Sequence, residues 1–287
     1  MNDLMISTCL WFDKEAAAAA AFYQTTFPDM KIIHETGKDD QNGFYSVTFE
    51  IGGHRFMAMN GGRSPLTPSI SFSYHCQTEA EIDMLWQQLS IDGMVMMPLQ
   101  RYDWNERYGF LQDRYGVSWQ LFLNPDAAVR LMPCLLFPYQ QNGVAVAAME
   151  LYTRTIPHSG IKAWFPYPEG EVKGNVMYGD YLLHGQLFSA MDSGVPMPAT
   201  FTDAVSLMVQ VKDQVMLDQI YNSLVEEGEA APCSWLKDRF GVWWQVVPAD
   251  LGSYIFHEDK QKAKQAMDAM LQMKKIDIRQ LQEAIQS

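Results

Sequence analysis

Basic residues are scarce in this sequence: 21 lysines and arginines stand against 34 aspartates and glutamates, for a formal net charge of −13 at pH 7. Nucleic acids and anionic membranes attract basic surfaces, so this charge argues against either as a partner. No apolar run approaches the roughly 18 residues that a membrane-spanning helix needs. The N-terminus also lacks the basic and apolar regions of a signal peptide. We therefore expect a cytoplasmic protein.

Cysteine is also scarce, at four residues in 287, and no two of them form a CxxC pair. Buried thiols in a reducing compartment are a better interpretation than a disulfide framework or a zinc site. The six histidines form no HxH or HExxH arrangement, which favours surface or hydrogen-bonded core histidines over metal ligands. His54, beside a hairpin turn, and His75, at a strand end, best suit another role. No predicted strand runs into the G-x-G loop and helix of a Rossmann site.

What the sequence does contain is a long internal repeat. The segment DRYGVSWQL at 113–121 returns as DRFGVWWQV at 238–246, an offset of 125 residues (238 − 113). CLWF at 9–12 and CLLF at 134–137 share this offset. Between these points the offset drifts, as expected where surface loops differ in length. The repeat predicts three parts: a first domain at 1–125, a second domain at 126–250 and a helical tail at 251–287.

Periodic patterns place the same elements in both halves. Asp13 is expected to cap an alanine-rich helix that ends before Pro28, and the segment 94–112 is expected to be a loop. In the first half we predict strands over 6–12, 30–35, 45–51, 54–59, 69–76 and 117–123, and helices from 16 and over 79–90. In the second half we predict strands over 132–137, 204–211 and 242–247, a hairpin over 175–191, and helices over 142–152 and 215–226.

The tail is predicted to form two amphipathic helices, over 259–273 and 278–285, with Asp277 as the N-cap of the second. The simpler interpretation is a helical hairpin packed on its own chain. An interface between two copies is the alternative, so both a monomer and a homodimer stay open.

Four stretches of the sequence are informative together: LWFD at 10–13 with the alanines and FY that follow, GGHRFMAMNGG at 52–62, the strand at 113–121, and MLQMKKIDI at 270–278. They resemble the PhnB-like subfamily, also labelled 3-demethylubiquinone-9 3-methyltransferase-like, of the vicinal oxygen chelate superfamily (glyoxalase/bleomycin resistance/extradiol dioxygenase). The resemblance implies an α+β fold of four βαβββ modules, arranged as two tandem glyoxalase-like domains. Paired modules would form a curved antiparallel or mixed sheet with a concave cup. Whether each half builds its own cup or the two halves pair with each other stays open.

The resemblance also implies where a divalent metal would bind. Metal-dependent members of the superfamily present His, Glu or Gln from four strands of the cup. Only two glutamines at these places could ligate, and neutral amides alone hold a divalent ion poorly. A shift of one residue would bring in Met57 or Ile70, which is no better. We expect no tightly bound metal and no other cofactor. The positions are Ser7, Phe56, Ser69 and Gln120 in the first half, and Met132, Phe188, Ala204 and Gln245 in the second.

The cup is instead predicted to hold an organic ligand. If Val117, Trp119 and Leu121 pack against the helices, Gln120 lies on the cup face. Each glutamine either binds a ligand or is satisfied by its sheet neighbours, and both interpretations stay open. Aromatic and small polar groups on the same register suit an organic ligand with a few polar handles. The predicted ligand-binding residues are Trp11, Ser69, Ser71, Trp104, Tyr108, Gln120, Trp243 and Gln245.

The functional hypothesis is a small-molecule-binding protein of the PhnB-like group, which sequesters its ligand or catalyses weakly by positioning alone. One alternative is a metal-dependent lyase, isomerase or dioxygenase resembling glyoxalase. A second is the quinone methyl transfer that the subfamily label suggests. No catalytic residue is assigned.

Overall fold

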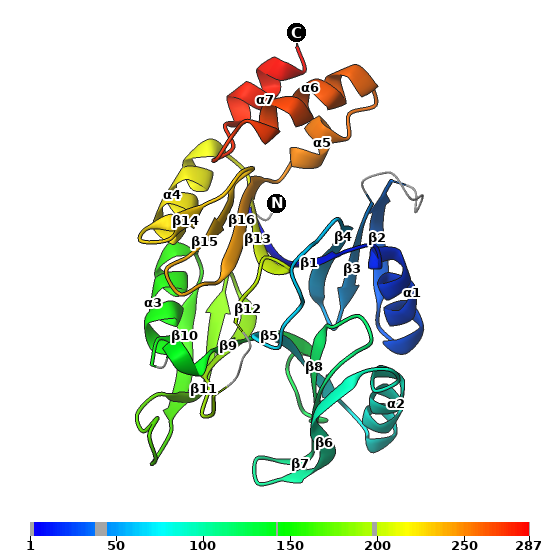
Figure 1. Ribbon diagram of the computed structural model, residues 1–287, viewed down its shortest axis with the longest axis vertical. Coiled ribbons are helices and arrows are strands. Elements are labelled where there is room, and N and C mark those ends of the chain that lie inside the picture. The colour runs from blue at the N-terminus through cyan, green and yellow to red at the C-terminus, as the bar shows by residue number, and fades with distance from the viewer. Residues whose placement is uncertain (1–2, 38–44, 142, 197–199, 287) are drawn as a thin grey trace.

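Two mixed eight-stranded sheets form the body of the protein in a computed structural model, which describes residues 3–37, 45–141, 143–196 and 200–286 (Figure 1). Sheet A has the order β14 (Glu229–Ala230), β15 (Trp235–Lys237), β16 (Trp243–Pro248), β13 (Val205–Val211), β1 (Leu4–Phe12), β4 (His54–Asn60), β3 (Ser46–Ile51), β2 (Lys31–Thr36). Sheet B has the order β10 (Gly160–Pro166), β11 (Val176–Leu183), β12 (Gln186–Asp192), β9 (Leu131–Phe137), β5 (Ile70–Cys76), β8 (Ser118–Leu123), β7 (Asn105–Gln112), β6 (Met94–Tyr102). The helices are α1 (Ala16–Thr26), α2 (Glu79–Leu89), α3 (Ala145–Thr155), α4 (Gln214–Val225), α5 (Leu251–Ile255), α6 (Lys260–Leu271) and α7 (Ile278–Ala284), with a 3₁₀ turn at Tyr139–Gln141.

Each sheet is built from one βαβββ module of each half of the chain. β1 pairs antiparallel with β13, from Leu4 opposite Val211 to Leu10 opposite Val205. β5 pairs antiparallel with β9 in the same way in sheet B. The predicted fold class is confirmed, and the open question is decided: the two halves pair with each other through both sheets.

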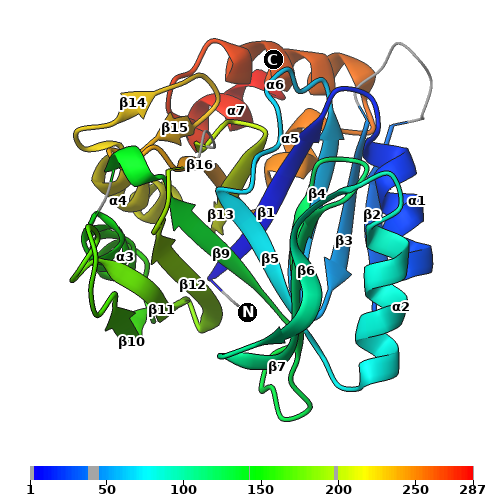
Figure 2. The ribbon, with the colours of Figure 1, turned by 60° about the horizontal axis from the view of Figure 1, so that its bottom comes forward.

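The core lies between the two sheets and the helices that flank them. Phe56 of sheet A meets Phe72 of sheet B edge to face, with ring centroids 4.9 Å apart. Helices α1 and α2 close one side of the molecule and α3 and α4 close the other (Figure 1, Figure 2). Trp119 and Leu121 are fully buried in this core, as predicted, so alternate residues of β8 face away from it.

A buried aspartate joins the two modules within each half. In the first half, Tyr23 of α1 donates a hydrogen bond to Asp113 Oδ2 at 2.8 Å, and Trp119 Nε1 donates to the same oxygen at 2.9 Å. The backbone amides of Tyr115 and Val117 donate to Asp113 Oδ1. Burial raises the pKa of Asp113, while these four hydrogen bonds oppose the rise. Because Tyr23 and Asp113 belong to different modules, the contact fixes α1 against β8.

Two local predictions were wrong. The segment 94–112 is a hairpin, β6 and β7, rather than a loop. Its pairing has three register shifts, and Pro98 lies in β6 at the edge of the sheet, so the alternation that marks a strand is lost. Asp13 does not cap α1; Asn60 Oδ1 accepts a hydrogen bond from the amide of Ala16 at 2.9 Å instead.

The tail packs on its own chain, as the simpler interpretation predicted. Cys233 N and Ser234 N donate to the carbonyl oxygens of Met273 and Lys274, and Ile276 is fully buried. Asp277 caps α7 as expected, accepting from Gln280 N. The tail helices lie beside β16, at the end of the molecule away from β7 (Figure 1). None of the helices in the described ranges has both the length and the apolarity required to cross a bilayer.

We predict that Asp113→Asn lowers the free energy of unfolding by about 2–4 kcal/mol, because an amide replaces one acceptor oxygen with a donor group that faces existing donors. Tyr23→Phe, which removes one of the four donors, should cost about 1 kcal/mol. Urea unfolding of both variants measures the difference. Equal effects of the two substitutions would contradict the proposed role of the carboxylate.

We also predict that the two halves stay together after the chain is cut. A protease site inserted at the exposed Pro125–Asp126 junction should give two fragments that co-elute in gel filtration, because both sheets run across the cut. The cut protein in denaturant serves as the control for complete cleavage. Fragments that separate under native conditions would show that the halves fold independently.

Candidate functional site

A cavity of about 790 Å³ lies against the face of sheet A that points away from the core. We call it the sheet A cup. Its walls come from β1 to β4 of the first half and from β13, β15 and β16 of the second. Helices α5 and α6 of the tail complete it, through residues such as Leu251, Phe256 and Met270. The cup therefore needs both halves and the tail.

Apolar and soft side chains dominate this wall. Trp11 of β1 and Trp235 of β15 lie side by side, with ring centroids 5.1 Å apart. Trp11 Nε1 donates to the Asn60 carbonyl oxygen at 3.0 Å, which fixes the indole ring. Methionine is flexible and polarisable, so a wall rich in it adapts to apolar ligands of different shape. The methionines of the wall are Met5, Met57, Met59, Met208, Met267 and Met270.

Two polar groups of the sheet A cup have unused hydrogen-bonding capacity. Gln245 Nε2 donates to Ser206 Oγ at 2.9 Å, but Gln245 Oε1 accepts no hydrogen bond from any residue that the structure describes. Ser7 Oγ is buried in the wall and likewise has no partner within the described ranges. Buried polar groups are normally paired, so both atoms are suited to a ligand with a donor or acceptor.

On the corresponding face of sheet B, the equivalent glutamine is hydrogen-bonded on both sides of its amide. Gln120 Nε2 donates to Ser71 Oγ at 2.8 Å, and Tyr108 donates to Gln120 Oε1 at 2.8 Å. Burial raises the pKa of Tyr108, so its hydroxyl keeps the proton. Phe122 packs against the Tyr108 ring at 4.7 Å. Here the amide is satisfied by its neighbours.

The strand register explains the difference between the two cups. Gln120 lies opposite Phe110, and Gln245 lies opposite Trp235. Two residues before these partners stand Tyr108, within β7, and Cys233, in the turn that precedes β15. Cys233 lines the sheet A cup. The second half thus lacks a tyrosine that would donate a hydrogen bond to Gln245 Oε1, and this oxygen remains open to the cavity.

The eight predicted ligand-binding residues are divided between the two sheets. Trp11 and Gln245 line the sheet A cup. Trp243 is not among the lining residues, but its ring centroid lies 6.4 Å from that of the wall residue Trp235. The others belong to sheet B, where Ser71, Tyr108 and Gln120 contact one another, Ser69 is buried beside β5, and Trp104 is 60% exposed and stacks on Tyr102.

Several wall residues were missed from sequence, namely Met57, Arg55 and Trp235. The alternation of 54–59 puts Arg55, Met57 and Met59 on one face and was a usable signal. Trp235 carried none, because its strand is three residues long.

The positions implied for a metal do not fit one. Phe56 and Phe188 are fully buried in the core, so Met57 takes the cup position on β4. The cup positions then offer the thioether of Met57, the hydroxyl of Ser7 and the amide of Gln245. These three groups are poor ligands for a divalent ion. Burial raises the pKa of the neighbouring Cys9 thiol to about 12, which keeps it protonated. Within the described ranges no group of three or more His, Cys, Asp or Glu side chains could hold a metal.

The two histidines singled out from sequence lie outside the sheet A cup. His54 accepts or donates one hydrogen bond with Thr8 Oγ1 at 2.8 Å and packs between Phe56 and Phe188 in the core. Burial lowers its pKa to about 3. His75 stacks on Phe122 of sheet B, and burial, with a smaller effect of Arg130, lowers its pKa to about 4. Both are neutral at pH 7.

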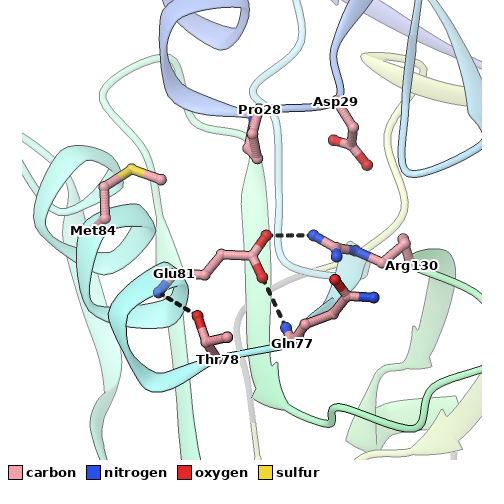
Figure 3. A pocket seen from close by; sticks show the side chains of 7 residues that line it. All are labelled: Pro28, Asp29, Gln77, Thr78, Glu81, Met84 and Arg130. Atoms are coloured by element: carbon pink, nitrogen blue, oxygen red, sulfur yellow. Dashed lines mark hydrogen bonds and ion pairs between the residues drawn. The ribbon is translucent and has the colours of Figure 1, made fainter.

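A second, open pocket of about 580 Å³ lies between the end of α1 and the start of α2 (Figure 3). Its polar groups are occupied by one another. The Glu81 carboxylate accepts from Arg130 and, at 2.7 Å, from Gln77 N, while Thr78 caps the helix at Glu81 N. These contacts attach the segment between the two halves to α2, and we interpret the pocket as structural.

Comparisons with known proteins agree with this architecture. Residues 5–122 and again residues 129–247 match the family described as 3-demethylubiquinone-9 3-methyltransferase. No protein with a curated description matches the chain. Among solved structures, the PhnB protein of Bacillus cereus, provisionally described under the same family name, is 34% identical over 41% of this chain and 98% of its own, with a TM-score of 0.39.

Two further structures span most of the chain and share its fold. Glyoxalase I of Zea mays is 11% identical, covers 86% of this chain and 93% of its own, and has a TM-score of 0.58. A Bacillus subtilis protein provisionally described as a dioxygenase is 12% identical, covers 97% and 94%, and has a TM-score of 0.52. Tandem βαβββ modules in paired eight-stranded sheets define a member of the vicinal oxygen chelate superfamily. Within it, the chain belongs to the PhnB-like 3-demethylubiquinone-9 3-methyltransferase family.

The depressed pKa of His54 predicts acid sensitivity. A histidine that ionises near 6.5 when unfolded and near 3 when folded stabilises the protein fully above pH 6.5, and this stability is lost as the pH falls toward 3. The loss should approach roughly 1 kcal/mol for each pH unit below 6. His54→Gln should show a shallower decline in urea unfolding between pH 7 and pH 4.5. Identical pH dependence in variant and parent would contradict a buried neutral His54.

Proposed function

We propose that the sheet A cup binds a small, mostly apolar organic molecule without a tightly held divalent metal. The observation that carries this proposal is the cavity of about 790 Å³, whose largely apolar wall contains Ser7 Oγ, buried and without a partner in the described residues, and Gln245 Oε1, which accepts no hydrogen bond from them. A pocket of this size with few polar groups suits a small organic molecule. Trp11 and Trp235 would contact its apolar part.

The chemistry of the wall favours binding over proton transfer. Cys9 keeps its proton, and His54 and His75 lie outside the wall. The one histidine of the described wall, His34, shares a hydrogen bond with Thr36 Oγ1 at 2.9 Å. The wall can bury a ligand, exclude water and hold one orientation through Ser7 and Gln245. We infer a role in binding or sequestration, or in catalysis that depends on positioning alone.

Two other functions are favoured by single observations. The fold is shared with glyoxalase I of Zea mays, which favours a metal-dependent lyase, isomerase or dioxygenase. Against this, the strand positions implied for the metal ligands carry Ser7, Met57 and Gln245, and the one histidine among the described wall residues, His34, shares a hydrogen bond with Thr36. The family description favours quinone methyl transfer. Against that, no strand of the sequence leads into a glycine-rich nucleotide-binding loop and helix.

We predict that the neutral fluorescent probe N-phenyl-1-naphthylamine binds once per chain. Met57→Trp should weaken its binding by roughly tenfold or more, because the larger side chain fills the cup. Met97→Trp makes the same change on β6 of sheet B and is the matched control; it should leave the affinity unchanged. A titration followed by probe emission measures both. Absence of binding, or equal effects of the two substitutions, would reject the sheet A cup as a ligand site.

Two measurements address the other functions. Elemental analysis of protein purified without chelators should find far less than one metal ion per chain, whereas stoichiometric zinc, nickel, manganese or iron would favour the metal-dependent enzyme. Calorimetry with S-adenosylmethionine should give no binding heat, and a saturable heat would favour methyl transfer.

A further inference from the structure

We propose that the ligand of the sheet A cup is an elongated apolar acid, whose anionic group pairs with Arg55. This proposal rests on the proposed function and specifies the ligand class. Arg55 lies on β4, on the same face as Met57 and Met59, and lines the cavity. Among the described residues of the wall it is the single lysine or arginine, and no aspartate or glutamate joins it there.

The guanidinium of Arg55 has no anionic partner within the described ranges. Arg55 Nη1 lies 2.7 Å from Met5 Sδ, a weak acceptor that carries no negative charge. Glu50 is opposite Arg55 in the sheet register, but the two side chains form no ion pair. Glu50 also does not line the cavity. Arg55 is therefore available to a ligand acid.

Arginine suits this task because its planar fork can donate two parallel hydrogen bonds to one carboxylate. A charge beside an apolar wall is also poorly hydrated, which strengthens its attraction to an anion. The whole protein, at a net charge of −13, repels anions. A preference for acids over neutral ligands must then come from a local cation.

The sheet register indicates the length of the ligand. Trp11 lies opposite Met59 in the pairing of β1 with β4, and Arg55 lies four residues before Met59. Four residues along a strand span about 13 Å. The cationic end and the tryptophan end of the cup are separated by this distance, with Met57 between them. A chain of roughly ten carbons that carries one terminal acid would reach both ends.

The test compares two ligands that differ in the acid group alone, decanoate and 1-decanol, by displacement of N-phenyl-1-naphthylamine at pH 8. In the unmodified protein, decanoate should displace the probe at roughly tenfold lower concentration than 1-decanol. Arg55→Met should abolish this preference while 1-decanol keeps its potency, and Arg55→Lys should keep part of it. Arg101→Met, which removes an exposed arginine of sheet B, is the matched control and should change nothing.

Each remaining outcome opposes the proposal or the function beneath it. If the probe itself fails to bind the cup, the proposed function falls. If the probe binds but decanoate and 1-decanol displace it equally, or if Arg55→Met keeps the preference for decanoate, the assignment of an acidic ligand is rejected. The proposed function then stands. If Arg55→Met no longer binds the probe, the unmodified protein is tested instead, with added sodium chloride. Salt screens the charge of Arg55, so the preference for decanoate over 1-decanol should shrink as the salt concentration rises, and a constant preference overturns the proposal.

Discussion

A buried carboxylate holds together the two modules of each half, and the rest of the architecture depends on it. Asp113 and Asp238 each accept hydrogen bonds from a tyrosine of the preceding module, from a tryptophan of the following strand and from two backbone amides. A carboxylate taken out of water is costly unless its oxygens are satisfied, so this geometry tolerates little change. This requirement explains why the D-R-aromatic-G-V segment occurs in both halves of the sequence.

With its two modules fixed to each other, each half presents two open strand edges, β1 and β5 in the first half and β9 and β13 in the second. β1 pairs with β13, and β5 pairs with β9. The cup of sheet A is consequently a shared structure. Trp11 comes from the first half, Trp235 and Gln245 from the second, and the tail completes the wall. Duplication then allowed the two cups to diverge: Tyr108 occupies the amide of Gln120, whereas Cys233 leaves the amide oxygen of Gln245 open.

The alternation of residues along β8 predicted its buried face, with Val117, Trp119 and Leu121 against the helices. It failed at β6, where bulges and Pro98 interrupt the period of two. The predicted ligand-binding residues do not form one site in the structure. Trp11 and Gln245 line the sheet A cup, whereas Ser71, Tyr108 and Gln120 belong to the other sheet, where they hydrogen-bond to one another. Residue type alone does not distinguish a free amide from a paired one, because the partner of Gln120 is twelve residues away and in another strand.

The sequence by itself determined the duplication, the α+β class, the family and the poor donor set of the cup, because these follow from repeated local patterns and from residue identity. Tertiary structure alone decided which modules share a sheet, where the tail lies, and that Arg55 stands without a carboxylate partner among the described residues. The physical reason is that strand pairing across the halves joins residues far apart in the chain: 207 positions (211 − 4) separate Leu4 from Val211, and 65 (135 − 70) separate Ile70 from Leu135. Such contacts are set by the shape and burial of whole surfaces, which no short stretch of sequence encodes.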